Sequence, residues 1–167
     1  MTEFTKSAEE LQRQAFRRTV YHIWSMIQAG LIDEMNEAEY AIAEILLEHP
    51  EYEDFFEDEK ILDGRKFDAG SEVNPFLHIS LHKMIEDQLE AGRPEEVRFF
   101  FESMEAKGND RHEIVHVIMK VLSILIYEAI NSRQSLDVDR YRSILEQCCN
   151  FRLDEITEIL DRKIFGR

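Results

Sequence analysis

Cysteine is almost absent from this chain: the two in its 167 residues are adjacent, at Cys148 and Cys149, and cannot form the spaced bridges of a disulfide framework. No apolar run approaches the roughly 20 residues that a membrane-spanning helix needs. The first fourteen residues show neither the apolar core of a signal peptide nor an amphipathic transit pattern. These absences predict a cytoplasmic protein that does not bind membranes, with both cysteines as ordinary helical residues.

Positive charge is also scarce, because 20 Lys and Arg residues face 35 Asp and Glu residues, and the net charge is −15. The excess is concentrated between positions 33 and 73, which hold fifteen acidic and three basic residues. A surface this acidic repels phosphate backbones, so we expect no nucleic-acid partner. The acidic segment 51–63 is either a docking site for a basic protein or, as is usual for such runs, a solvated face.

Proline and glycine are rare, three and six residues respectively, and most stand where a helix would begin or end. Apolar residues between these signals recur at helical spacing, and no alternating strand pattern is present. We therefore predict an all-α helical bundle of about six to seven helices in a single domain. The expected helices span about 8–29, 37–48, 75–91, 94–107 and 111–131, which form the core at about 8–131, and a C-terminal pair within about 136–165 packs on it.

Further predictions concern residues 50–73 and the buried face of helix 75–91. Residues 50–56 can add one or two helical turns, and residues 58–73 form an acidic loop that contains glycine. In helix 75–91 the core-facing stripe is predicted to contain Leu77, Leu81, Met84 and Ile85. The apolar C-terminal helices offer a second surface for a protein partner or a second copy of the chain.

Two pairs of histidines repeat the same spacing: His78 with His82, and His112 with His116. Residues four apart on a helix face the same way, with Cβ atoms about 5–6 Å apart, so that two imidazoles can bind one ion. Short loops make successive helices antiparallel, and helices 75–91 and 111–131 then run parallel. Because both pairs lie in the first two turns of their helices, we expect them at the same end of the bundle.

Further candidate ligands belong to that end. His49, next to Glu48, ends helix 37–48, whereas His22 lies well inside the first helix and is expected at the opposite end. The start of a helix disfavours a protonated histidine and so favours the neutral form that binds metals. Imidazoles with one or two carboxylates suit zinc, iron or manganese. The predicted ligand set is therefore His49, His78, His82, Glu86, His112, Glu113 and His116.

Two other interpretations remain open. In the first, the histidines are structural or solvated, since Lys120 follows His116 by one turn and would repel a cation, and the protein is a non-enzymatic interaction module without metal. In the second, HEIVH at 112–116 is the H-E-x-x-H motif of a zinc-dependent hydrolase with Glu113 as general base. The second lacks the extended downstream motif and the strand that such proteases use. No pattern identifies a substrate or a reaction.

The stretches HPEY at 49–52, NPFLHISLHKMIEDQL at 74–89 and HEIVHVIMKVL at 112–122 resemble, in order and spacing, a bacterial family known as domain of unknown function 1841. The resemblance covers roughly residues 10–135 and implies a small soluble bacterial protein, with no established activity to carry over. It implies that the family's motif positions are His49, Asn74, Pro75, His78, His82, His112 and His116. The acidic loop and the segment after about 135 are expected to be particular to this chain.

Overall fold

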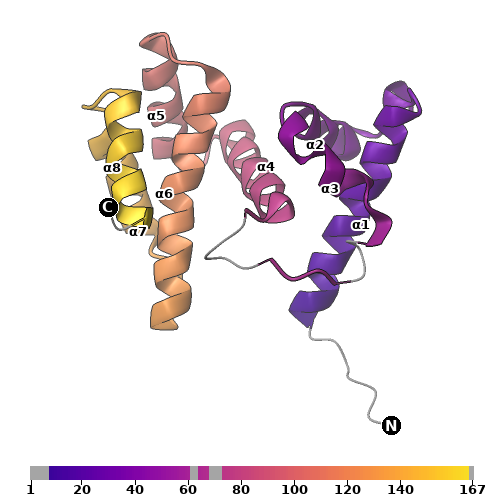
Figure 1. The fold of residues 1–167 in the computed structure, drawn as a ribbon. Helices are drawn as coiled ribbons and strands as arrows, with labels where there is room; N and C mark the ends of the chain where they lie inside the picture. The colour runs from indigo at the N-terminus through magenta and orange to yellow at the C-terminus, as the bar shows by residue number, and fades with distance from the viewer. Residues whose placement is uncertain (1–7, 61–63, 68–72, 166–167) are drawn as a thin grey trace. The chain divides into compact units, whose positions relative to one another are not determined.

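The computed structural model describes residues 8–60, 64–67 and 73–165, and every regular element among them is helical. The all-α class is therefore confirmed. Short 3₁₀ turns occupy Ile32–Glu34 and Pro50–Tyr52, the second of them where the sequence predicts an additional turn. The α-helices are α1 (Ala8–Gln28), α2 (Glu37–Leu47), α3 (Glu53–Glu57), α4 (Pro75–Ala91), α5 (Glu95–Ala106), α6 (Arg111–Ser132), α7 (Val138–Cys148) and α8 (Leu153–Phe165) (Figure 1).

The chain divides into two compact units, residues Met1–Lys83 (unit 1) and Met84–Arg167 (unit 2). Helix α4 contributes its first half to unit 1 and its second half to unit 2. The single-domain assignment stays a prediction. Among the described residues, none of the helices combines the length and the apolar character that crossing a bilayer requires.

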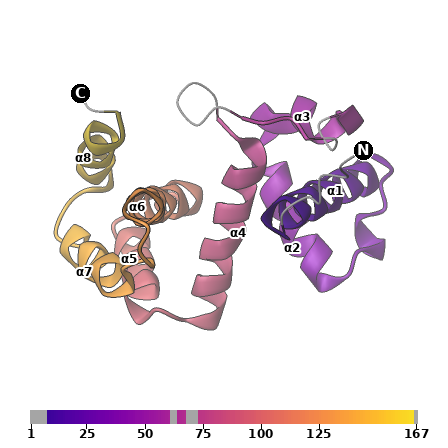
Figure 2. The ribbon, with the colours of Figure 1, turned by 90° about the horizontal axis from the view of Figure 1, so that it is seen from below.

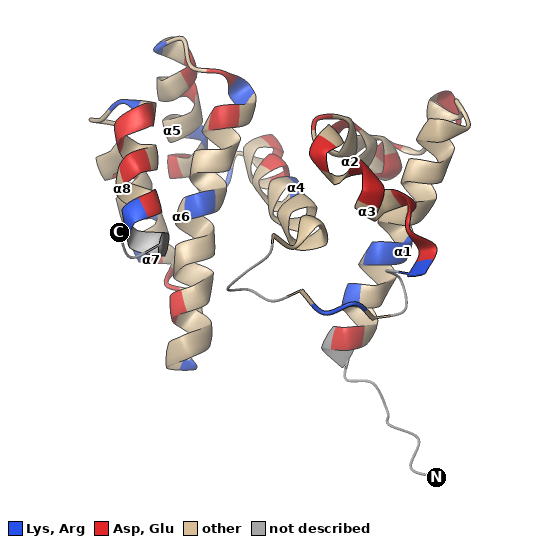
Figure 3. Ribbon diagram, in the orientation of Figure 1, with Lys and Arg blue, Asp and Glu red and all other residues tan. Residues whose placement is uncertain are grey.

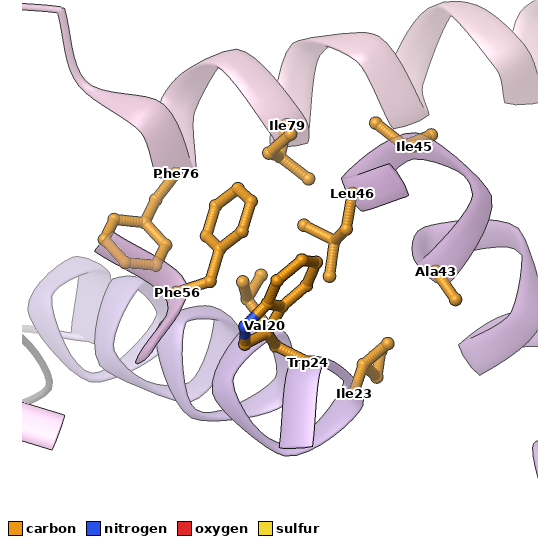
Figure 4. Packing of buried hydrophobic residues seen from close by; sticks show 9 residues of the cluster. All are labelled: Val20, Ile23, Trp24, Ala43, Ile45, Leu46, Phe56, Phe76 and Ile79. Atoms are coloured by element: carbon orange, nitrogen blue, oxygen red, sulfur yellow. The ribbon is translucent and has the colours of Figure 1, made fainter. Parts of the chain in front are cut away.

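Unit 1 is built on a core in which α1, α2, α3 and the start of α4 meet. Helix α2 begins at a capping box, in which the Asn36 side chain accepts from the Glu39 backbone N–H and the Glu39 carboxylate accepts from that of Asn36. Figure 4 shows the side chains of the core pointing toward one another from these four helices. They are Val20, Ile23, Trp24, Ala43, Ile45, Leu46, Phe56, Phe76 and Ile79, each at most 7% exposed.

The core-facing stripe predicted for α4 is partly wrong. Leu77 and Met84 are 55% and 42% exposed, whereas Phe76 and Ile79 are buried. The buried face of α4 also includes His82, which is 1% exposed. A prediction from apolar spacing assigns histidines to the polar face of a helix. The predicted stripe therefore left out the buried His82 and included the exposed Leu77 and Met84.

Unit 2 is organised around α6, which is more apolar than α5, α7 and α8. In Figure 2, which looks nearly along α6, the helices α5, α7 and α8 surround it, and α5 packs on α6 and α7. The hydroxyl of buried Tyr141 donates to Gln88 Oε1 at 2.9 Å and so ties α7 to the second half of α4. Burial raises the pKa of the Cys149 thiol at the end of α7, which disfavours the reactive thiolate. This agrees with an ordinary helical role for that cysteine.

Candidate metal centre

His49 lies in the short connection that follows α2. Pro50 cannot donate the backbone hydrogen bond that would continue the helix, so the chain turns at His49 into the 3₁₀ turn Pro50–Tyr52. The imidazole is fully buried, and its Nδ1 lies 2.7 Å from the carbonyl oxygen of Ile45. Because a carbonyl can only accept, Nδ1 carries a proton and donates it. In the neutral ring Nε2 therefore keeps its lone pair.

His78 and His82 occupy the first two turns of α4 in unit 1. The backbone N–H of Leu77 donates to Asn74 Oδ1 at 3.2 Å and that of His78 to the Asn74 carbonyl at 3.0 Å, which starts the helix at Pro75. This start aims both histidines at His49: their ring centroids lie 4.6 Å and 5.1 Å from the His49 centroid. His49 therefore lies beside this pair, and the role of the three residues as metal ligands stays a prediction.

The nitrogen atoms of His78 and of His82 each lie close to those of His49. His78 Nε2 lies 2.9 Å from His49 Nε2, and a ligand nitrogen of His49 lies within 4.8 Å of one of His82. In a tetrahedral zinc site with Zn–N distances of about 2.0–2.1 Å, neighbouring ligand atoms are about 3.3 Å apart. The His49–His78 separation thus differs from that of a metal-bound pair by less than about half an ångström. We call His49, His78 and His82 the unit 1 histidine cluster.

An aromatic ring and a carboxylate border the unit 1 histidine cluster. Tyr52 stacks on His49 at 5.9 Å between centroids with an interplanar angle of 6°, and it contacts the edge of His78 at 5.3 Å. Burial, with a further contribution from Glu51, raises the pKa of the Tyr52 hydroxyl. Glu48 Oε2 lies 3.8 Å from His82 Nε2. Tyr52 was not among the predicted site residues, although its position one 3₁₀ turn beyond His49 places both rings on one face.

The second predicted pair lies at the start of α6 in unit 2. Asp110 caps this helix, since its carboxylate accepts from the backbone N–H groups of His112 and Glu113 at 2.9 Å and 3.3 Å. The rings of His112 and His116 have centroids 4.1 Å apart, and a ligand nitrogen of one lies within 4.8 Å of one of the other. This spacing of four therefore also forms a local pair, as predicted.

The two predicted acidic ligands lie in unit 2 and differ in their surroundings. Glu86 is paired with the guanidinium of Arg111, which already supplies a positive partner for its carboxylate. Glu113 is exposed and, with His116, lines a cleft of about 730 Å³ between α6 and α8. Their role as metal ligands stays a prediction.

Two further residues bear on the alternatives. The positive charge of Lys120, which argued against a cation, is compensated by Asp161 at 2.8 Å. His22 has a side chain 63% exposed and lies 3.9 Å from Glu39, in the first turn of α2, whereas His49 follows the last turn. His22 is thus at the opposite end of α2 from the unit 1 histidine cluster, as the sequence indicated.

The donor set of the unit 1 histidine cluster fits a transition-metal ion. Neutral imidazole nitrogens are good ligands for zinc and iron, and a neighbouring carboxylate balances part of the ion's charge. Metal-bound histidines nearly always donate their second ring N–H to a carbonyl or carboxylate, which fixes the tautomer. The Nδ1–H of His49 makes this contact with Ile45. His49 is therefore oriented as a metal ligand would be.

Comparison with known proteins identifies the family of this chain. Residues 12–147 match the family described as a domain of unknown function (DUF1841), and this span contains the unit 1 histidine cluster and the pair on α6. The match continues through most of α7, so the expectation that the chain becomes particular after about residue 135 is wrong up to residue 147, whereas residues 148–167 lie outside the match. No curated protein and no solved structure matches the chain. With most of its length matched, the chain belongs to the DUF1841 family.

Proposed function

We propose that this protein binds a transition-metal ion through the unit 1 histidine cluster. The observation that carries the proposal is the 2.9 Å approach of His78 Nε2 to His49 Nε2, with the His49 tautomer set by the Ile45 carbonyl. Without metal, this approach is a hydrogen bond from His78 Nε2–H to the lone pair on His49. A metal ion takes the place of the shared proton once His78 carries its own proton on Nδ1.

His82 supplies the third nitrogen, and Glu48 is close enough to approach the ion or to balance its charge. Three protein ligands with a fourth position left to water are the pattern of a catalytic zinc site, whereas four protein ligands are the pattern of a structural one. The sequence predicts that His112 and His116 act on the same ion, and this sharing is part of the proposal. Zinc, iron and manganese are the ions that such a donor set favours.

Cobalt(II) provides a direct test, because its visible absorption reports the number and geometry of its ligands in place of zinc. Titration of the full chain should give a saturating visible band at about one ion per chain. Changes that only disturb outer contacts of a metal site cost about 10–100-fold in affinity, so His78→Ala, which removes a ligand, should cost more. The matched control is His22→Ala, which should leave the titration unchanged.

His49 is fully buried, so its replacement by alanine can disturb the fold. The cobalt affinity of His49→Ala is therefore interpreted only if its circular dichroism spectrum matches that of the unchanged protein. His78 is half-buried and supplies the same information at less risk to folding. Equal cobalt affinity in His78→Ala and His22→Ala would overturn the proposal, because His78 would then not be a ligand. The absence of a saturable band in the unchanged protein would leave the metal-free interaction module. A change in the cobalt band in His112→Ala would support sharing of the ion, whereas an unchanged band would restrict the site to the unit 1 histidine cluster.

A further inference from the structure

Helix α2 presents exposed apolar side chains within a strongly acidic surface of unit 1. Residues 37–57, from the start of α2 to the end of α3, contain eight acidic and no basic residues. Figure 3 shows both helices in red and tan without blue. Two large apolar side chains of α2, Tyr40 and Leu47, are 46% and 51% exposed. This helix therefore leaves apolar area uncovered among carboxylates.

The exposed residues of α2 follow a heptad spacing. Tyr40 and Leu47 are seven residues apart, and Glu37 and Glu44 precede them by three residues each. Residues three, four and seven apart on a helix share a face, so we call these four residues the outer face of α2. Leu46 is fully buried, so a different side of the helix faces the core. Apolar residues one heptad apart, flanked by charged residues, are the pattern by which one helix pairs with another.

The carboxylates of the outer face are not neutralised within the described part of the protein. Glu37 and Glu44 are exposed, and neither carboxylate forms an ion pair or a hydrogen bond with any residue that the structure describes. Glu39, by contrast, closes the capping box of α2 and lies near His22. Positive charge is therefore what the outer face lacks, and a partner that supplies it reduces the repulsion between the carboxylates.

We propose that the outer face of α2 docks a basic amphipathic helix of a partner protein. The apolar residues of this partner, one heptad apart, cover Tyr40 and Leu47, and its flanking Lys or Arg residues pair with Glu37 and Glu44. Nucleic acids and anionic lipid surfaces are repelled by the same carboxylates, and the net charge of −15 disfavours a second copy of the chain. A contact along an 11-residue helix is short, so we expect a weak and transient complex. The proposal does not depend on metal binding.

A synthetic peptide provides the test, and the backbone amide signals of the full chain in NMR spectra locate its binding. The probe is a helical peptide of about 21 residues, with leucine at the apolar position and lysine at the flanking positions of each heptad, because helices shorter than about 12–15 residues are marginal in water. It should shift the amide signals of α2 saturably. A peptide of the same composition in scrambled order should bind at least about tenfold more weakly.

Two matched comparisons separate docking from general attraction. Leu47→Ala should weaken binding about fivefold, because apolar area is lost from the contact, whereas Leu11→Ala, at a residue 54% exposed on α1 of the same unit, should not. The charge variant combines Glu37→Gln with Glu44→Gln. Its control combines Glu90→Gln with Glu105→Gln, which removes the same charge from exposed positions of unit 2. The first should weaken binding about three- to tenfold more than the second.

Equal losses in the two charge variants, or equal affinity for the ordered and the scrambled peptide, would overturn the proposal, since either result would mean general attraction of a basic peptide to an acidic protein. The absence of saturable shifts in α2 would overturn it as well. Sedimentation equilibrium without peptide tests the other occupant. A concentration-dependent dimer that Leu47→Ala abolishes would assign the outer face of α2 to a second copy of the chain and would also contradict the proposal.

Discussion

Replacing Phe56 by alanine should destabilise unit 1 strongly, because this side chain joins three of its segments. Phe56 is 1% exposed, and its ring centroid lies 5.6 Å from that of Trp24 on α1 and 6.4 Å from those of Tyr52 and Phe76. Removing a buried phenyl ring costs about 3–5 kcal/mol through lost burial and the cavity left behind. With a urea dependence of about 2 kcal/mol per molar, a loss of about 4 kcal/mol lowers the unfolding midpoint by about 2 M.

Trp24 makes this prediction straightforward to measure. It is the only tryptophan of the chain and belongs to the core of unit 1, so its fluorescence during urea unfolding reports on that unit. Leu11→Ala is the control in the same unit, since Leu11 is 54% exposed and truncating it should cost less than about 0.5 kcal/mol. A loss below about 1 kcal/mol in Phe56→Ala would refute the reasoning, because α3 would then contribute little to the core.

Two further stability measurements test other parts of the fold. Tyr141→Phe removes the hydrogen bond to Gln88 and should cost about 1 kcal/mol, measured by circular dichroism during urea unfolding. Burial raises the pKa of the Tyr141 hydroxyl, so the unfolded chain releases this proton first; stability should fall as the pH rises above about 10, and less steeply in Tyr141→Phe. Asn36→Ala breaks the capping box of α2 and should lower the free energy of unfolding by about 1 kcal/mol, measured by thermal unfolding. Asn36→Asp keeps a side-chain oxygen at the cap and should lose much less stability.

The helices themselves were largely predictable, because their start signals are local. Asn36 and Asp110 accept hydrogen bonds from the first turns of α2 and α6, as their positions before apolar stretches indicated. The exception is α3, only five residues long, where the pattern indicated turns but no boundaries. A helix this short depends on the packing of Phe56 rather than on its own sequence preferences.

The orientation of a helix depends on tertiary contacts, and here the sequence was less informative. The stripe predicted for α4 placed Leu77 and Met84 in the core, but the buried face follows Phe76, Ile79 and His82. A buried histidine looks polar in an apolar pattern even though its ring packs among other rings. The burial of His82, which the apolar pattern did not predict, places this residue in the unit 1 histidine cluster.

The candidate site was predictable in part for the same reasons. A spacing of four on one helix fixes a local pair, and both histidine pairs form as expected. The stacking of Tyr52 on His49 was missed because these rings share a face through the three-residue period of a 3₁₀ turn, which the α-helical spacing used for the prediction does not describe.

The metal content of the purified full-length chain, measured by elemental analysis after expression with added zinc, iron and manganese, tests the central claim most directly. We expect about one transition-metal ion per chain, and almost none when His49 and His78 are both replaced by alanine. Metal well below one ion per chain in the unchanged protein, or the same content in the double variant, would contradict the assignment of the unit 1 histidine cluster as a metal centre.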